Sequence, residues 1–327
     1  MTSTNEGLEN KTGVVVLLIL CVIASIVSLF IIVLVIFDRR FHGTTEILMG
    51  NLAIADLLLS AIGVPTKLAQ ALSSSDDFVG TDAVCKIMMF TPMLSISSSI
   101  FTMTAMSFER VLAIIKNVHL REIHHKVIII SIVWALSVIS AGPQIYEYST
   151  YLKFEEEENK TEISCGSHGI EENFETIYAS ILVFVGYVLP LVIISCNYGL
   201  IIRFLWNFSK SEGRDGPGSE VKGAVFKARV RVAKMIFTAT ALFAILWLPF
   251  FVFFTMEEVT GTDDSSEIGS TLQTLKQALI VISTFSNPIV YACYQKKFRS
   301  GIISLLSGKT FRGQRVEDTS TMSTAVS

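Results

Sequence analysis

Charged residues are scarce in this chain. Asp, Glu, Lys and Arg make up 17% of its 327 residues, whereas hydrophobic residues make up 51%. A soluble domain carries about 25% charged residues. The mean hydropathy is correspondingly high, at +0.56. This composition is atypical of a soluble protein, so the distribution of the apolar residues decides what kind of protein the chain is.

Cysteine is also scarce, with five residues and no spacing typical of a zinc site. Three of the five lie in or beside apolar runs, where cysteine is usually a small buried hydrophobe. Cys85 and Cys165 lie in polar segments and are the candidates for one disulfide. The sequence also lacks a paired nucleophile and base and a phosphate-binding glycine-rich loop. We therefore do not expect an enzyme.

The chain has long apolar runs instead. Residues 14–37 form a run of 24 residues without charge, and spanning a bilayer takes about 20. A cleaved signal peptide would need a basic start and a shorter apolar core. Residues 1–13, however, carry Glu6 and Glu9 against a single Lys11. The run is therefore predicted to be a true membrane span.

Six further apolar runs follow, at 47–72, 87–115, 127–145, 177–202, 235–256 and 272–294. Backbone groups in lipid must be hydrogen-bonded within the segment, and these runs are longer than barrel strands, so they should be helices. The sequence predicts an all-α membrane protein, a seven-transmembrane helix bundle over residues 14–294. At 295–306, basic and apolar residues alternate at helical spacing, which predicts a short amphipathic eighth helix on the membrane lipid.

The distribution of charge orients the bundle. The N-terminal segment (1–13) and the second, fourth and sixth connections carry four basic residues, whereas the other connections and the tail carry 19. The positive-inside rule therefore places the N-terminus outside and the tail (307–327), predicted to be disordered, in the cytoplasm. The outer side carries 19 acidic residues, and the sequons at Asn10 and Asn159 fall on it, as glycosylation requires. We expect a multi-pass plasma-membrane glycoprotein.

One acidic residue, Asp56, lies inside the second apolar run. A carboxylate at that depth is costly unless it is hydrated or paired, so it indicates a functional site more strongly than a structural polar residue. Oxygen atoms of Ser99, Ser283, Thr284 and Asn287 could join it, and such a set suits a hard cation such as Na⁺. A proton is the alternative occupant.

Proline interrupts three of the later runs, at Pro190, Pro249 and Pro288. Proline within a membrane helix removes one backbone hydrogen bond and gives the helix a place to bend. Three kinked helices together with buried polar residues indicate a bundle that switches between two states.

Several motifs occur together along the runs: NLAIADLLL (51–59), Cys85 and Arg110 25 residues apart, Glu109-Arg110-Val111, Trp134, Pro190 with Tyr198, FAILWLP (243–249), Asn287-Pro288-Ile289-Val290-Tyr291, and Phe298. On these motifs the chain resembles the rhodopsin-like (class A) G-protein-coupled receptors, over roughly residues 14–306. Valine replaces tyrosine in the Asp/Glu-Arg-Tyr motif. Ser28 replaces the asparagine that normally supports Asp56, which leaves a thinner polar network.

The resemblance implies roles for these residues. The switch for G-protein coupling would be Glu109, Arg110, Tyr198, Asn287, Pro288 and Tyr291. The core trigger would be Ile100, Pro190, Phe243, Trp247 and Pro249. The sodium site would hold an allosteric Na⁺ through Asp56, Ser99, Ser283, Thr284 and Asn287, and Cys85–Cys165 would join the third span to the second outer loop.

Other positions bear on the class of ligand. Val281 stands where opsins have the Schiff-base lysine, so no retinal is expected, and Pro92 stands where aminergic receptors have an aspartate. The acidic outer face would concentrate cationic ligands, which favours a basic neuropeptide; a merely solvated, glycosylated surface is the alternative. The candidate pocket residues are Met88, Pro92, Gln144, Tyr146, Glu147, Phe250, Phe251, Phe254, Gln273 and Gln277.

The implied mechanism is a population shift in which an agonist favours an outward position of the sixth span. Arg110 would then engage the C-terminal helix of a heterotrimeric G protein. Many relatives hold this arginine with an acid at the base of the sixth span, but KARVRVAK (227–234) offers Arg229 and Arg231 there. With Glu109 left as its partner, we expect a looser inactive state and measurable basal signalling.

Arrestin is a further expected partner through the Ser and Thr residues of 319–324, and no nucleic acid is expected. The alternatives are a receptor of the same fold for a small non-amine ligand or lipid, a non-signalling scavenger, and a seven-span transporter. A transporter should show internal repeats or helices broken in matching halves, and neither is visible in the sequence. The intact Arg110, Asn287 and Tyr291 argue against a non-signalling receptor.

Overall fold

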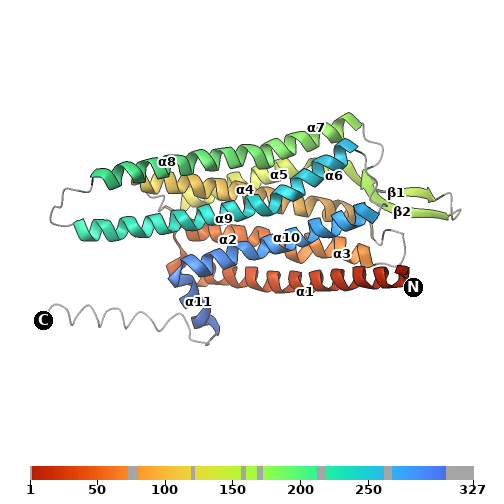
Figure 1. Ribbon diagram of the computed structural model, residues 1–327, viewed down its shortest axis with the longest axis horizontal. Coiled ribbons are helices and arrows are strands. Elements are labelled where there is room, and N and C mark those ends of the chain that lie inside the picture. Colours follow the sequence, from red (N-terminus) through yellow and green to blue (C-terminus); the bar gives the residue numbers. More distant parts are fainter. Residues whose placement is uncertain are drawn as a thin grey trace.

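The computed structural model describes residues 2–72, 78, 80–118, 122–155, 160–167, 172–211, 219–260 and 267–306. Its long helices lie side by side along the longest axis of the molecule (Figure 1). The start of α1 and the strands β1 and β2 lie at one end, and α11 lies at the other (Figure 1). The hairpin and α11 thus mark different ends of the bundle.

The helices are α1 (Thr2–Phe37), α2 (Thr44–Leu58), α3 (Val64–Leu72), α4 (Asp82–Ile114), α5 (Ile123–Ala141), α6 (Pro143–Glu147), α7 (Glu172–Val183), α8 (Leu189–Ser211), α9 (Ser219–Thr260), α10 (Glu267–Tyr294) and α11 (Lys296–Leu306). A short 3-10 turn, η1 (Arg39–Phe41), follows α1. The π-helical turns η2 (Leu59–Gly63) and η3 (Phe184–Val188) join α2 to α3 and α7 to α8. Each of these pairs therefore forms one continuous span.

Within the described residues, six stretches are long and apolar enough to cross a membrane: Thr12–Phe37, Thr44–Leu68, Asp82–Ile114, Ile123–Glu147, Thr176–Asn207 and Lys227–Phe253. Large apolar side chains cover their outward faces, for example Ile26 at 63% exposure and Ile139 at 71%. Such a surface is unfavourable in water and suits hydrocarbon. The chain is a helical membrane bundle, as the apolar runs predict; the predicted seventh span, 272–294, forms part of α10 (Glu267–Tyr294) but is not among these six.

Two features depart from the predicted all-α bundle. The strands β1 (Tyr148–Glu155) and β2 (Lys160–Ser167) form an antiparallel hairpin. The acidic composition of this segment is typical of a solvated loop, and the strands depend on pairing with each other, which no helical period reveals. The helix α1 also begins at Thr2, before the apolar run of 14–37, because helical hydrogen bonding continues through the polar residues.

Proline shapes more of the bundle than the sequence indicates. Each π turn is followed directly by a helix with an early proline, Pro65 in α3 and Pro190 in α8. Proline cannot donate to the preceding turn, and a π turn accommodates the resulting mismatch within a helix. Pro249 and Pro288 lie inside α9 and α10 as predicted, and Pro92 lies inside α4.

The helix α4 contacts several neighbouring helices and positions the site. A buried hydrogen-bond chain joins it to its neighbours, since Trp134 Nε1 donates to Asn51 Oδ1 at 2.9 Å and Asn51 Nδ2 donates to Thr102 Oγ1 at 2.8 Å. On another face of α4, Asn197 Nδ2 donates to Ser107 Oγ at 2.9 Å. These bonds fix α2, α5 and α8 around α4.

Candidate functional site

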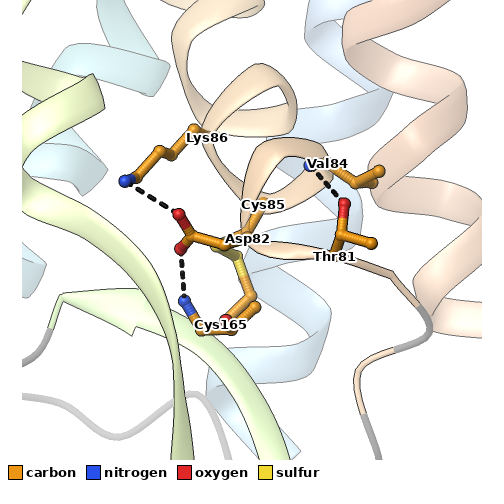
Figure 2. The surroundings of a disulfide bond; sticks show 7 residues. Thr81, Asp82, Val84, Cys85, Lys86 and Cys165 are labelled. Carbon is orange, nitrogen blue, oxygen red and sulfur yellow. Dashed lines mark hydrogen bonds and ion pairs between the residues drawn. A yellow bond between two sulfur atoms is a disulfide. The ribbon is translucent and has the colours of Figure 1, made fainter.

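A disulfide anchors the hairpin end of the bundle. Cys85 in the first turn of α4 bonds to Cys165 on β2, as predicted (Figure 2). Beside it, Asp82 accepts the amide of Thr150 at 3.1 Å and pairs with Lys86 at 2.8 Å. Thr150 and Cys165 face each other in the hairpin ladder. The first turn of α4 therefore binds β1 at Thr150 and β2 at Cys165, two residues that are paired in the hairpin.

A buried polar cluster lies next to the hairpin. Gln144 and Glu147 on α6 are 5% and 4% exposed, and Gln144 Nε2 donates to Glu147 Oε2 at 3.0 Å. On α7, the Tyr178 hydroxyl donates to the carbonyl of Ser140 at 2.8 Å. Gln277 on α10 is also buried, and its Oε1 has no hydrogen-bond partner within the described part of the chain. This end of the bundle can bind polar groups.

The other predicted pocket residues differ in their placement. Met88, Pro92 and Phe251 are buried, and Phe250 is half-buried. Tyr146 is 73% exposed, whereas the adjoining Glu147 is buried, because neighbouring residues on a helix take different faces. The side chains of the two remaining candidates, Phe254 and Gln273, lie outside the described residues.

Two residues of the predicted core trigger, Phe243 and Trp247, lie in a connected aromatic stack on α9. The ring centroid of Trp247 lies 5.7 Å from that of Phe243 and 5.2 Å from that of Phe250. Both Phe243 and Trp247 share one buried cluster with Ile100, whose side chain is fully buried. Pro190 is buried at the start of α8, and Pro249 lies two residues beyond Trp247.

Sequence reasoning missed Tyr187 in this region. It lies in the π turn η3, its ring centroid is 4.5 Å from that of Phe251, and its hydroxyl donates to the carbonyl of Ala244 at 2.7 Å. The tyrosine therefore connects η3 to α9 just before Pro190. Its position three residues before that proline is the only signal in the sequence, and it does not identify the partner.

The structure brings together Asp56 and Asn287 of the predicted sodium site. Asn287 Nδ2 donates to Asp56 Oδ2 at 3.1 Å, and both side chains are buried. The hydroxyls of Ser283 and Thr284 donate to carbonyls of their own helix at 2.7 Å, which leaves their oxygen lone pairs as acceptors. Ser99 is buried on α4.

Several buried oxygen atoms have no hydrogen-bond partner within the described ranges: Ser28 Oγ, Ser95 Oγ, Ser98 Oγ, Asn287 Oδ1 and Tyr291 Oη. A buried carboxylate with a neighbouring amide oxygen is a ligand set that fits a hard cation. Ser28 donates no bond to Asp56 within the described part of the chain, which agrees with the thinner network expected there. The residues present therefore fit Na⁺, with Asp56 as the charged ligand.

Another group with metal-ligand chemistry lies at the start of α5. Glu122, His124 and His125 are exposed, with one ligand atom from each within 4.8 Å of the others. His124 Nδ1 lies 3.2 Å from Glu122 Oε2. The start of a helix carries partial positive charge and disfavours a cation. The simplest interpretation is a solvated polar contact.

The end of the bundle opposite the hairpin contains the predicted charge pair. Glu109 and Arg110 are 6% and 7% exposed, and the guanidinium of Arg110 is paired with Glu109. Arg110 also donates to the hydroxyl of Thr45 in the first turn of α2. That hydroxyl in turn donates to Glu109 Oε2 at 3.2 Å. Glu109, Arg110 and Thr45 form a closed, internally neutral cluster, which we call the charge cluster.

A second arginine joins α9 to α4 at this end. Arg229 Nη1 donates to the carbonyl of Ala113 at 3.1 Å and to Asn117 Oδ1 at 2.8 Å. The neighbouring Arg231 is exposed. The sequence alone does not identify these acceptors, because one is a backbone carbonyl of α4 and the other is the side-chain amide of Asn117, just beyond the end of α4.

Two buried tyrosines complete the set of predicted switch residues. Tyr198 on α8 and Tyr291 on α10 are 4% and 2% exposed, and neither hydroxyl has a hydrogen-bond partner among the described residues. Tyr198 meets Phe237 edge-on at 5.2 Å between ring centroids, and Tyr291 meets Phe298 of α11 edge-on at 6.0 Å. Tyr291 therefore connects α10 to α11.

The turn between α1 and α2 carries an ion pair. Arg40 Nη2 lies 2.7 Å from Asp38 Oδ2, and Asp38 is 4% exposed. Burial raises the pKa of Asp38, but the hydrogen bonds and positive charge of Arg40 outweigh it and leave the pKa below its ordinary value. Lys297 of α11 pairs with Glu46 of α2 close by. These contacts attach α11 to the start of α2.

Comparison with known proteins places the whole bundle in one group. Residues 12–291 match the model of the family described as 7 transmembrane receptor (rhodopsin family). A QRFP-like peptide receptor from Branchiostoma floridae is 25% identical over 300 residues, which are 90% of this chain and 78% of the relative. Galanin receptor 2b from Danio rerio is 30% identical over 283 residues, 86% of this chain and 70% of the relative. The Substance-P receptor from Homo sapiens is 27% identical over 290 residues, 88% of this chain and 68% of the relative.

Proposed function

Because the chain belongs to the rhodopsin family of seven-transmembrane receptors, we propose that it binds a basic neuropeptide outside the cell and activates a heterotrimeric G protein inside. The family consists of signalling receptors, not enzymes. The observation that carries the choice of ligand is that relatives matched over most of their length are named as receptors for QRFP-like peptide, galanin and substance P.

The hairpin end is the proposed ligand side. A peptide is long enough to contact both the hairpin and the buried polar pair of Gln144 and Glu147. The 19 acidic residues assigned to this side would attract a ligand with a positive charge over a distance. Electrostatics and the named relatives thus support the same ligand class.

The proposed orientation follows from the basic residues. The hairpin end and the start of α1 face outward from the plasma membrane, and α11 lies on the inner leaflet with its basic residues toward lipid headgroups. The chain divides into an outer segment (1–13), the bundle (14–294), helix α11 within 295–306 and a cytoplasmic tail (307–327) that offers Ser and Thr residues to arrestin. The sequons follow this division, although the side chain of Asn10 and all of Asn159 lie outside the described residues.

Signal transfer in this proposal uses the aromatic stack. A peptide that contacts Phe250 or Phe251 changes the packing of Trp247, and Tyr187 passes the same displacement to η3 before Pro190. Prolines and π turns are the places where these helices bend most easily. The agonist therefore favours a state in which the base of α9 has moved away from α4.

Arg110 is the proposed contact with the G protein. In the off state it is paired with Glu109 and Thr45, so its donors are not presented to a partner. When α9 moves outward, Arg110 can donate to the carbonyl end of a G-protein helix, which carries partial negative charge. The buried hydroxyls of Tyr198 and Tyr291 are the groups that gain most from new partners in that state.

Na⁺ is proposed as an allosteric ligand of the off state. Asp56 would supply the negative charge and Asn287 the neighbouring amide oxygen, with Ser99, Ser283 and Thr284 as further oxygen donors. A cation held there stabilises whichever state keeps these oxygens together. Because Ser28 adds less support than an asparagine would, we expect the affinity to be weak.

A peptide panel tests the ligand proposal. Cells expressing the receptor are exposed to galanin-class, tachykinin-class and QRFP-class peptides and to other basic amidated peptides, with calcium and cyclic AMP as readouts. At least one basic peptide should give a saturable response. Replacing Glu155, Glu156, Glu157 and Glu158 with glutamine should then lower its potency and flatten the salt dependence of its association.

The control is the same glutamine substitution at Glu46, which faces the cytoplasmic end and should leave the salt dependence unchanged. A response restricted to neutral or acidic peptides would contradict the choice of a basic ligand. Unchanged potency in the glutamine variant of the four outer residues would contradict electrostatic steering.

A further inference from the structure

One arginine fastens α9 to α4 at the charge-cluster end. A single atom, Arg229 Nη1, donates to both the Ala113 carbonyl and Asn117 Oδ1, at 3.1 and 2.8 Å. The surrounding segment 227–234 contains no acidic residue. Ala113 lies at the end of α4 and Asn117 lies just beyond it. Both acceptors are neutral oxygens, so the charged donor binds a polar helix end instead of a carboxylate.

The end of α4 is well suited to accept this donor. The last four carbonyls of a helix lack intrahelical partners and carry partial negative charge, and Ala113 lies in the last turn before Ile114. Asn117 has φ 54°, in the left-handed region that asparagine tolerates better than most residues. The amide of Val118 closes the turn by donating to the Leu112 carbonyl at 3.0 Å. The turn thereby brings the Asn117 side-chain oxygen to the same donor as the Ala113 carbonyl.

We propose that Arg229 is a positioning residue for the receptor's switch and that its bridge to Ala113 and Asn117 holds α9 against α4 in the off state. Ala113 lies three residues after Arg110, which is about one helical turn. The bridge and the charge cluster therefore lie side by side on α4. Outward movement of α9 must break the bridge, whereas the charge cluster, formed by α2 and α4 alone, can survive a small displacement.

The arrangement also separates two positive charges. Arg110 is neutralised by Glu109, and Arg229 is directed to the helix end one turn away. The two guanidinium groups would repel each other if Arg229 took the position of an acid facing Arg110. The sequence predicts basal signalling because the base of α9 offers no acid to hold Arg110. The bridge limits that signalling, because it holds α9 against α4 without an acid.

The inference rests on the proposed G-protein coupling, and basal signalling tests it without an agonist. Variants are compared at equal surface expression, with dissociation sensors for each class of heterotrimeric G protein. Arg229→Ala should raise basal signalling roughly three- to tenfold, the shift expected when a charge-assisted hydrogen bond is lost from one of two states. Asn117→Gly, which keeps the left-handed turn but removes the oxygen, should act in the same direction.

The double variant shows whether the two residues act through one contact. Arg229→Ala with Asn117→Gly should signal no more strongly than Arg229→Ala alone, because that single variant already removes both bonds of the bridge. Arg229→Lys should retain part of the restraint. Arg231→Ala is the matched control, since Arg231 is exposed on the same segment, and its basal signalling should match that of the wild type.

A distance measurement separates failure of the bridge from failure of G-protein coupling. Spin labels are placed at Lys116 and Lys227, which are both exposed, on a background with Cys196 and Cys293 replaced by serine. In Arg229→Ala the distance distribution without agonist should shift to longer values. Unchanged distances with unchanged basal signalling, or an equal effect of Arg231→Ala, would overturn the inference. Longer distances without any G-protein response would support the bridge and contradict the proposed function.

Discussion

At the scale of residues, the charge cluster shows how two charges can be buried at the base of a membrane helix. Burying an ion pair is unfavourable unless its remaining donors and acceptors are also satisfied. Thr45 meets that condition by accepting from Arg110 and donating to Glu109. The pairing of Glu109 with Arg110 could be predicted because the two are adjacent in sequence. The contact of Thr45 with this pair could not be predicted, because it depends on how α2 packs against α4.

Thr45→Val tests this role. Valine has nearly the same shape but no hydroxyl, so a buried donor of Arg110 and an acceptor of Glu109 would lose their partner, at a cost of about 1–3 kcal/mol. We expect a lower melting temperature of the purified receptor and higher basal signalling. Thr45→Ser keeps the hydroxyl and should stay close to the wild type in both measurements. If valine and serine behave alike, the hydroxyl does not stabilise the off state.

At the scale of elements, the spans were predictable and their irregularities were not. Long apolar runs identify membrane helices because backbone groups in lipid must be paired within the segment. The π turns before Pro65 and Pro190, and the strand pairing of 148–167, depend on contacts with other elements. Tyr187 shows the consequence, since its bond to the Ala244 carbonyl exists only because η3 turns it toward α9.

Removing the disulfide tests how the hairpin is held. Cys85 and Cys165 are 80 residues apart in sequence, and losing a native bond that closes a long loop typically costs about 2–5 kcal/mol. Replacing both with serine should lower the melting temperature and weaken the response to the active peptide, because only noncovalent contacts such as that of Asp82 with Thr150 then hold the hairpin to α4. Cys196→Ser, at an exposed free cysteine, is the control. An unchanged peptide response would show that the hairpin position does not matter for binding.

At the scale of the whole molecule, two specialised ends are joined by a bundle that can bend. The apolar runs predicted the span order, and the polar surroundings of Cys85 and Cys165 made them the candidates for the disulfide. The switch roles came from the resemblance to the receptor family. The sequence did not predict which side chains meet across the bundle, such as Arg229 with Asn117, since helix packing determines those distances. The central claim that unites both ends is that ligand binding at the hairpin controls Arg110.

The most direct measurement is guanine-nucleotide exchange on purified heterotrimeric G proteins by the receptor in lipid nanodiscs, with and without the active peptide from the panel. The wild type should accelerate exchange when the peptide is added, and Arg110→Ala should bind the same peptide without accelerating exchange. Equal exchange by wild type and Arg110→Ala, with peptide binding intact in both, would contradict the account.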